Sequence, residues 1–107
     1  SNMMIERYNQ SVLNAVRDVA INGTRLQTLN EQRVMQMERV DATHYTQAAA
    51  DAAYQRGLSS RLLATEAKLP VIAEDMSLLV IDTQRLMQNI QLIKALGGGY
   101  QAPANKK

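Results

Sequence analysis

The sequence of 107 residues contains no cysteine, no phenylalanine and no tryptophan, and it has four tyrosines. Without cysteine the chain has neither a disulfide framework nor thiolate chemistry. Without the bulky aromatic residues a thick globular core is not expected, whereas Ala, Leu, Ile, Val and Met suit thin seams between helices. The single histidine, His44, cannot form a metal cluster by itself.

Motifs for catalysis or cofactor binding are also missing. No nucleophile stands beside a suitable base, no His-Glu-x-x-His occurs, and the Gly-Gly-Gly near the C-terminus has neither a preceding strand nor a following helix. We therefore predict that the chain is not an enzyme and takes no cofactor and no metal. The net charge of +2 comes from interspersed basic and acidic residues, so no nucleic-acid partner is expected. No window approaches the roughly 18–20 apolar residues of a membrane-spanning helix, and no secretory signal is present.

The second half of the chain carries the most regular pattern, an alternation of three and four residues between apolar positions. The positions are Leu62, Thr65, Leu69, Ile72, Met76, Leu79, Thr83, Leu86, Ile90 and Ile93. This heptad pattern predicts a helix over about 60–96 that packs along a seam. Further apolar residues on neighbouring faces, such as Val71, Leu78 and Leu92, indicate that the helix contacts partners on more than one side.

Pro70 lies inside this predicted helix. Proline removes one backbone hydrogen bond of a helix, so it either kinks the helix or marks its true start, with residues 60–69 forming a separate turn. Because the heptad register passes through the proline without a change of phase, we expect a kinked continuous helix.

The first half predicts a helix over about 4–55 with a less regular pattern. One register is held by Ile5, Tyr8, Val12, Ala15, Val19, Leu26 and Leu29. After Arg33 the apolar positions move to Val34, Met37, Val40, Tyr45, Ala48 and Ala52. We interpret this shift as a stutter in the heptad pattern. Asn22-Gly23 is a turn signal in isolation, so a break at 22–24 stays open as an alternative.

Between the two predicted helices lies the stretch 56–60. Gly57 is suited to the left-handed conformation that ends a helix, and Ser59 or Ser60 can cap the next one. The fold class predicted is therefore all-α, a long antiparallel helical hairpin or coiled coil. A lone hairpin cannot cover several apolar stripes, so we expect the isolated chain to self-associate.

Two stretches resemble the C-terminal part of TolC-like outer-membrane efflux proteins, in their lipoprotein-type branch. The stretch AAYQRGLSSRLLATEA contains the Tyr-x-x-Gly pattern found at a helical tip in that family, and IQLIKALGGGY contains its closing motif, from Leu92 to Tyr100. Upstream, VLNAVRDVA (12–20) is similar to the segment that enters the family's longest helix. The resemblance covers about residues 12–103, and its C-terminal motif is the more specific one.

This resemblance implies a fragment of a channel. Residues 1–3 would be an expression remnant and start, residues 4–97 a helical hairpin of a periplasmic tunnel, and residues 98–107 a flexible tail. It implies a homotrimer of the full-length protein in the outer membrane, with this segment in the periplasm. A periplasmic adaptor and an inner-membrane pump would complete a tripartite system that exports drugs or other small molecules.

At the tip the resemblance implies residues for adaptor docking or gating. Tyr54 and Gly57 match the tip motif, and Glu66 falls where the family often has aspartate. Leu58 would be the exposed apolar contact for a partner. Ser59 stands where TolC itself has arginine, and this departure puts the same charged gate in doubt.

Two other functions stay open from the residues alone. One is the hairpin of a periplasmic adaptor protein, which would be flanked by β-rich lipoyl-like sequence. The other is an oligomerising coiled-coil module without a role in transport.

Overall fold

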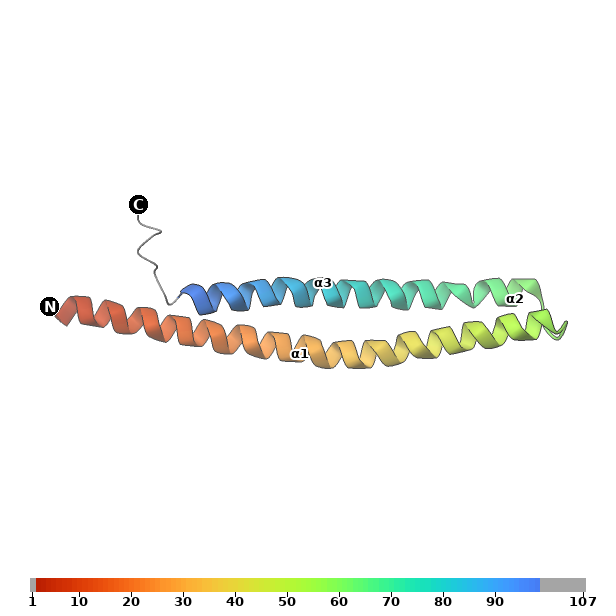
Figure 1. The fold of residues 1–107 in the computed structure, drawn as a ribbon, viewed down its shortest axis with the longest axis horizontal. Coiled ribbons are helices and arrows are strands. Elements are labelled where there is room, and N and C mark those ends of the chain that lie inside the picture. The colour runs from red at the N-terminus through yellow and green to blue at the C-terminus, as the bar shows by residue number, and fades with distance from the viewer. Residues whose placement is uncertain (1, 99–107) are drawn as a thin grey trace. The chain divides into compact units, whose positions relative to one another are not determined.

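The computed structural model describes residues 2–98, which form three helices, α1 (Asn2–Gln55), α2 (Arg61–Glu66) and α3 (Lys68–Gly98) (Figure 1). No strand occurs within this part of the chain. The prediction of an all-α antiparallel hairpin is confirmed, with the predicted turn at 56–60 between α1 and α2. Most of the predicted tail, residues 99–107, lies outside the described residues.

The chain divides into two compact units. The turn unit, residues 30–83, contains the second half of α1, the turn, α2 and the beginning of α3, and its two arms run antiparallel (Figure 1). The terminal unit, described over residues 2–29 and 84–98, pairs the first half of α1 with the end of α3.

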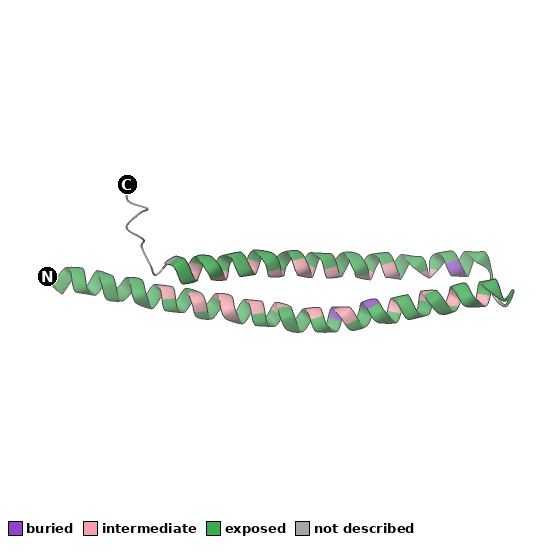
Figure 2. Cartoon of the chain, viewed as in Figure 1, coloured by how far each residue is buried: buried purple, intermediate pink, exposed green. Residues whose placement is uncertain are grey.

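Most residues of α1 that are buried or half-buried follow one unbroken heptad register, and Figure 2 shows them spaced along the helix. In the terminal unit they are Ala15, Val19, Asn22, Leu26 and Leu29; in the turn unit they are Arg33, Gln36, Val40, Thr43, Gln47 and Ala50. The predicted stutter after Arg33 is therefore wrong, and Val34 and Tyr45 are exposed. The register was hidden because polar side chains occupy several of these positions and pair with α3.

The Asn22-Gly23 pair does not break α1, since the helix is continuous through both residues. Asn22 occupies a packing position, and its Oδ1 accepts a hydrogen bond of 2.6 Å from Nε2 of Gln88 on α3. A side chain engaged across the helix pair in this way is not available to form the local turn that the dipeptide favours in isolation.

Along α2, Ala67 and α3 the residues facing α1 form a first heptad seam. We call it the covered seam, and its residues are Ala64, Ala67, Val71, Glu74, Leu78, Ile81, Arg85, Gln88, Leu92 and Ala95. The heptad pattern predicted from the sequence, Leu62 to Ile93, forms a second seam two residues away. Because two residues turn a helix by about 200°, the second seam lies on nearly the opposite face. Its apolar side chains are 44–66% exposed, and we call it the open seam.

The helix that was predicted to be continuous over 60–96 is interrupted for one residue, Ala67, between α2 and α3. Proline lacks an N–H, so Pro70 cannot donate to the carbonyl of Glu66 four residues earlier, and its ring would clash with that carbonyl. Ala67 keeps right-handed helical angles, and its N–H donates to the carbonyl of Leu63 at 3.0 Å. The outcome thus lies between the two interpretations of Pro70, and the heptad spacing continues across it.

Burial is slight in the described part of the chain. Only Val40, Ala64 and Gln36 have less than a tenth of their surface exposed, and all three belong to the turn unit. No helix within residues 2–98 is both long enough and apolar enough to cross a bilayer.

Candidate functional site: the turn and the polar contacts of the covered seam

The turn after α1 is a Schellman motif. Gly57 has a φ of 71°, its N–H donates to the carbonyl of Tyr54 at 2.9 Å, and the N–H of Leu58 donates to the carbonyl of Ala53 at 2.9 Å. This geometry agrees with the left-handed cap predicted for Gly57. An added Cβ would meet no atom within 4 Å, so a larger residue at Gly57 would be strained by its backbone angles and not by a contact.

The predicted tip residues gather at this turn, apart from one. Tyr54 is 37% exposed at the end of α1, Leu58 is 77% exposed, and Ser59 is half-buried. Glu66 lies farther on, as the exposed last residue of α2. The described residues thus place a large apolar side chain at the tip, on a backbone that the Schellman hydrogen bonds fix.

Ser60 caps α2. Its backbone is extended, and its Oγ accepts a hydrogen bond of 3.1 Å from the N–H of Leu63. Of the two serines that the sequence offered as caps, Ser60 takes the role. The turn is therefore fixed on both sides, by glycine at the end of one helix and by serine at the start of the next.

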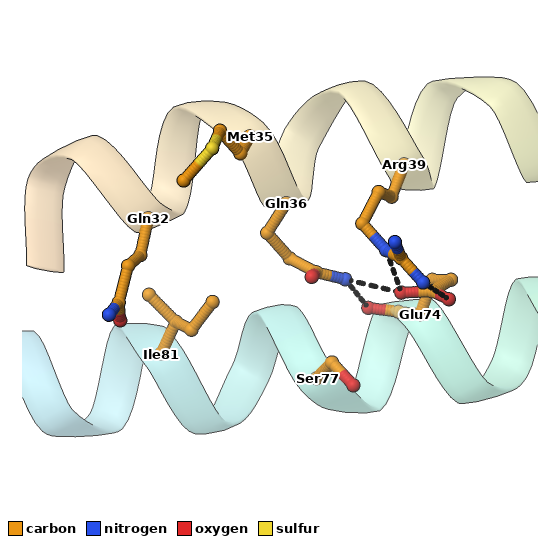
Figure 3. A pocket seen from close by; sticks show the side chains of 7 residues that line it. All are labelled: Gln32, Met35, Gln36, Arg39, Glu74, Ser77 and Ile81. Carbon is orange, nitrogen blue, oxygen red and sulfur yellow. Dashed lines mark hydrogen bonds and ion pairs between the residues drawn. The ribbon is translucent and has the colours of Figure 1, made fainter.

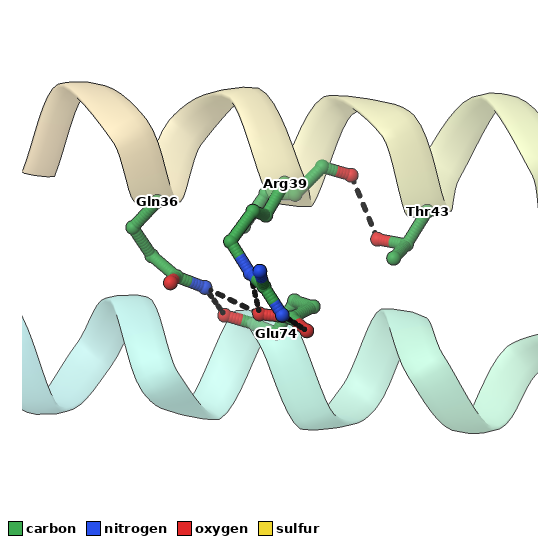
Figure 4. A network of polar contacts seen from close by, with 5 residues as sticks. Gln36, Arg39, Thr43 and Glu74 are labelled. Atoms are coloured by element: carbon green, nitrogen blue, oxygen red, sulfur yellow. Dashed lines mark hydrogen bonds and ion pairs between the residues drawn. The ribbon is translucent and has the colours of Figure 1, made fainter.

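A polar cluster that no motif in the sequence predicts lies in the middle of the turn unit. Gln36 Nε2 donates to Glu74 Oε1 at 2.8 Å and to the Glu74 carbonyl at 3.0 Å (Figure 4). Arg39 binds the same carboxylate through Nε and Nη2, at 3.2 Å to Oε1 and 3.0 Å to Oε2 (Figure 4). One carboxylate on α3 thus accepts hydrogen bonds from two side chains that lie about one helical turn apart on α1.

The electrostatics of the cluster follow from these contacts. The hydrogen bond from Arg39, followed by that from Gln36, holds the pKa of Glu74 below its ordinary value, because both bonds stabilise the carboxylate. The hydrogen bond to Glu74 and the negative charge of its carboxylate raise the pKa of Arg39. Glu74 is therefore ionised in the folded chain around neutral pH.

This cluster lines an open groove between the two helices of the turn unit. Its lining residues are Gln32, Met35, Gln36, Arg39, Glu74, Ser77 and Ile81 (Figure 3). Figure 3 shows that the amide of Gln36 and the guanidinium of Arg39 both point at Glu74. Since these groups satisfy one another, the cluster holds two helices together and offers no activated nucleophile or base.

Further polar pairs join the arms. In the turn unit Arg33 Nε donates to Asp82 Oδ1 at 2.7 Å, and His44 Nε2 lies 3.3 Å from Asp75 Oδ1. His44 thus contacts α3 while about half of its side chain stays exposed. No group of three or more His, Cys, Asp or Glu side chains within residues 2–98 is placed to hold a metal ion.

Comparison with known proteins gives a family and close relatives. The sequence model of the outer membrane efflux protein family matches residues 1–98. The multidrug resistance outer membrane protein MdtP of Escherichia coli (strain K12) is 76% identical over 102 residues, which are 95% of this chain and 21% of that protein. The multidrug resistance outer membrane protein MdtQ of Escherichia coli O6:H1 is 40% identical over 103 residues, which are 94% of this chain and 21% of that protein.

The chain thus spans about a fifth of the length of these curated relatives. No solved structure matches it.

Proposed function

The chain belongs to the outer membrane efflux protein family, and from this premise we propose that it forms part of the periplasmic tunnel of a trimeric outer-membrane channel. This channel exports drugs or other small molecules, together with a periplasmic adaptor and an inner-membrane pump. Family membership confirms the resemblance on which this proposal builds. It also confirms that the chain is not an enzyme, since the family is one of efflux proteins.

The pair of seams on α3 is the observation that carries the tunnel assignment. A helix that packs on a single neighbour needs one apolar stripe, whereas α3 has a covered seam and an open seam on nearly opposite faces. A helix in the wall of a tunnel has a neighbour on each flank, and this arrangement requires two such seams. In the full-length trimer the open seam would therefore contact a helix supplied by another part of the protein or by another protomer.

Export of drugs is carried over from the relatives, both of which are named multidrug resistance outer membrane proteins. We place this segment on the periplasmic side of the outer membrane. The absence of a candidate membrane-spanning helix within residues 2–98 is compatible with that location.

The turn is the part of the segment that we assign to contact with the adaptor. Leu58 is the apolar contact, Gly57 permits the turn, and Tyr54 and Ser59 support it from either side. In the full-length channel, Leu58→Asp should impair drug export and leave the trimer intact, because the side chain is at the tip and 77% exposed. Minimum inhibitory concentrations and native gel electrophoresis measure the two properties.

Leu58→Ala is the matched control, since it removes the side chain without adding charge and should impair export less. Normal export by the Leu58→Asp channel, or failure of that variant to form trimers, would show that the docking assignment is wrong.

A gating role for Glu66 has a separate test. If its carboxylate helps to hold the aperture closed, Glu66→Gln should give a more conductive channel in planar bilayers. Unchanged conductance would leave Glu66 as the exposed helix carboxylate seen here. The alternative roles, an adaptor hairpin or a coiled coil without a transport function, are not favoured by any feature of the described residues, and the matched family is that of the channel.

A further inference from the structure

The tip carries two basic side chains beside its exposed leucine. Arg56 precedes Leu58 by two residues and Arg61 follows it by three, and both arginines are exposed. In the described part of the chain neither guanidinium takes part in a hydrogen bond or an ion pair. The turn brings both cations to the same end of the turn unit as Leu58.

Elsewhere in the turn unit, two arginines of α1 form ion pairs with carboxylates of α3. Arg33 binds Asp82 and Arg39 binds Glu74. The tip differs because the stretch 52–65 contains both arginines and no acidic residue. The tip therefore presents two arginines around an apolar side chain, and the nearest acidic residues in the sequence, Asp51 and Glu66, lie five residues from Arg56 and Arg61 respectively.

The backbone at this point is fixed. The N–H of Leu58 is bound to the carbonyl of Ala53, and Ser60 caps α2 through the N–H of Leu63. Little conformational freedom is left for a partner to remove from the turn, which favours binding. Arginine is enriched among the residues that contribute most to binding at protein interfaces, and here two arginines flank an exposed apolar side chain.

We propose that the tip recognises an acidic protein surface, in which an apolar pocket receives Leu58 and carboxylates around the pocket accept hydrogen bonds from Arg56 and Arg61. This inference rests on the proposed function, because it assigns that surface to the periplasmic adaptor. Arginine suits the role, since its planar guanidinium can donate two parallel hydrogen bonds to one carboxylate. The charges also select among adaptors and speed the encounter.

The test uses the purified full-length channel and the purified periplasmic adaptors of the source organism, with binding measured by biolayer interferometry. The double variant Arg56→Glu/Arg61→Glu should weaken the dissociation constant of the cognate adaptor at least tenfold at 0.15 M salt. The difference should shrink as salt is raised, because exposed charges are screened. Arg56→Lys/Arg61→Lys should retain more of the affinity than the reversal does.

The matched control is Arg7→Glu/Arg25→Glu, which changes the net charge equally at two exposed arginines of α1 far along the chain from the turn. Its adaptor affinity should stay within twofold of the wild-type value. Changing adaptor carboxylates to lysine should restore binding to the Arg56→Glu/Arg61→Glu channel, which a merely structural role of the arginines would not allow.

The outcomes separate this inference from the proposed function. If an adaptor binds the wild type and the tip reversal equally well, the acidic partner surface is wrong and the docking role stands. An equal loss in the control variant would likewise overturn it, since bulk charge would then explain the effect. If no adaptor binds the wild-type channel, the proposed function and this inference both fail. Binding of phosphatidylglycerol vesicles that the tip reversal abolishes, with adaptor affinity unchanged, would assign the arginines to lipid and refute the inference.

Discussion

The two seams of α3 run along the same helix and carry different side chains. The open seam is apolar except for Thr65 and Thr83. The covered seam includes the charged Glu74 and Arg85 and the polar Gln88, together with several alanines. In this chain the face with the larger apolar side chains is left exposed, and the smaller, more polar face packs on α1.

The covered seam is built for one alignment of the two arms. Glu74 meets Gln36 and Arg39, and Gln88 meets Asn22, only when the helices stand in the observed register. A shift by one turn would leave these polar groups without partners, which costs more than their hydrogen bonds contribute. Polar residues within a coiled-coil seam fix register in this way, at some expense in stability.

The open seam, in contrast, sets no register of its own by polar pairing. Large side chains such as Leu62, Leu79 and Ile93 are each 66% exposed. An exposed apolar stripe of this length indicates a binding surface. From this difference we propose two tasks for the seams: the covered seam aligns the hairpin, and the open seam supplies the free energy of association with other helices.

The largest effect is expected for association of the isolated chain. It should sediment as a dimer or larger assembly at about 100 μM, and Ile72→Glu/Leu79→Glu/Leu86→Glu should make it monomeric. Three large side chains that lose their burial correspond to roughly 5 kcal/mol or more, a change of a thousandfold or more in the association constant. Analytical ultracentrifugation measures the result.

The control for this experiment places three glutamates elsewhere on the same helix. Gln84→Glu, Asn89→Glu and Gln91→Glu change exposed positions outside both seams. This variant should associate like the wild type. A monomeric wild-type chain at high micromolar concentration would contradict the role given to the open seam.

The same contrast explains which features could be predicted from the sequence. Apolar periodicity predicted a helix with a packing seam on residues 62–93. The residues are helical except at Ala67, but the predicted seam is exposed, because hydrophobicity alone marks the open seam and not the one that α1 covers. The covered seam is inconspicuous because residues such as Glu74 and Gln88 hold packing positions through pairing, which depends on the partner helix. For the same reason the polar residues Arg33 and Gln36 hide the true register of α1, and the apolar residues alone predict a stutter.

Local backbone chemistry was more predictable than packing. Gly57 and Ser60 act through hydrogen bonds within a few residues, so their roles could be deduced from residue type and spacing. Pro70 showed that the helix would be disturbed, but whether it bends or separates into two helices depends on how the carbonyl of Glu66 is accommodated. The cluster of Gln36, Arg39 and Glu74 was missed because Glu74 lies more than thirty residues from the other two in sequence.

A smaller effect is expected within the covered seam. Gln36 is 8% exposed and donates both of its hydrogen bonds to Glu74, so Gln36→Ala should lower the free energy of unfolding by about 1–3 kcal/mol. Urea denaturation measures this stability in a chain that also carries Ile72→Glu/Leu79→Glu/Leu86→Glu, so that association does not contribute. Gln32→Ala is the control, since Gln32 is an exposed residue one turn earlier on α1 and should change stability by less than about 0.5 kcal/mol. Equal effects of the two substitutions would show that the polar contact does not stabilise the hairpin.

The smallest effect concerns the pH dependence of the covered seam. Because hydrogen bonds from Arg39 and Gln36 hold the pKa of Glu74 below its ordinary value, the folded chain binds this proton less readily than the unfolded chain does. The stabilisation is complete above the ordinary carboxyl pKa and is lost as pH falls through the lowered pKa of the folded state. Arg39→Ala removes the largest cause, so it should raise the pKa of Glu74 toward its ordinary value and reduce the loss of stability on acidification. This change in the pKa of Glu74 is small because the Arg39 side chain is 67% exposed and salt screens the pair.

Carbon-13 NMR titration of the Glu74 carboxyl group in the wild type and in Arg39→Ala measures the change. An identical pKa in the two proteins would mean that Arg39 does not hold this carboxylate in solution.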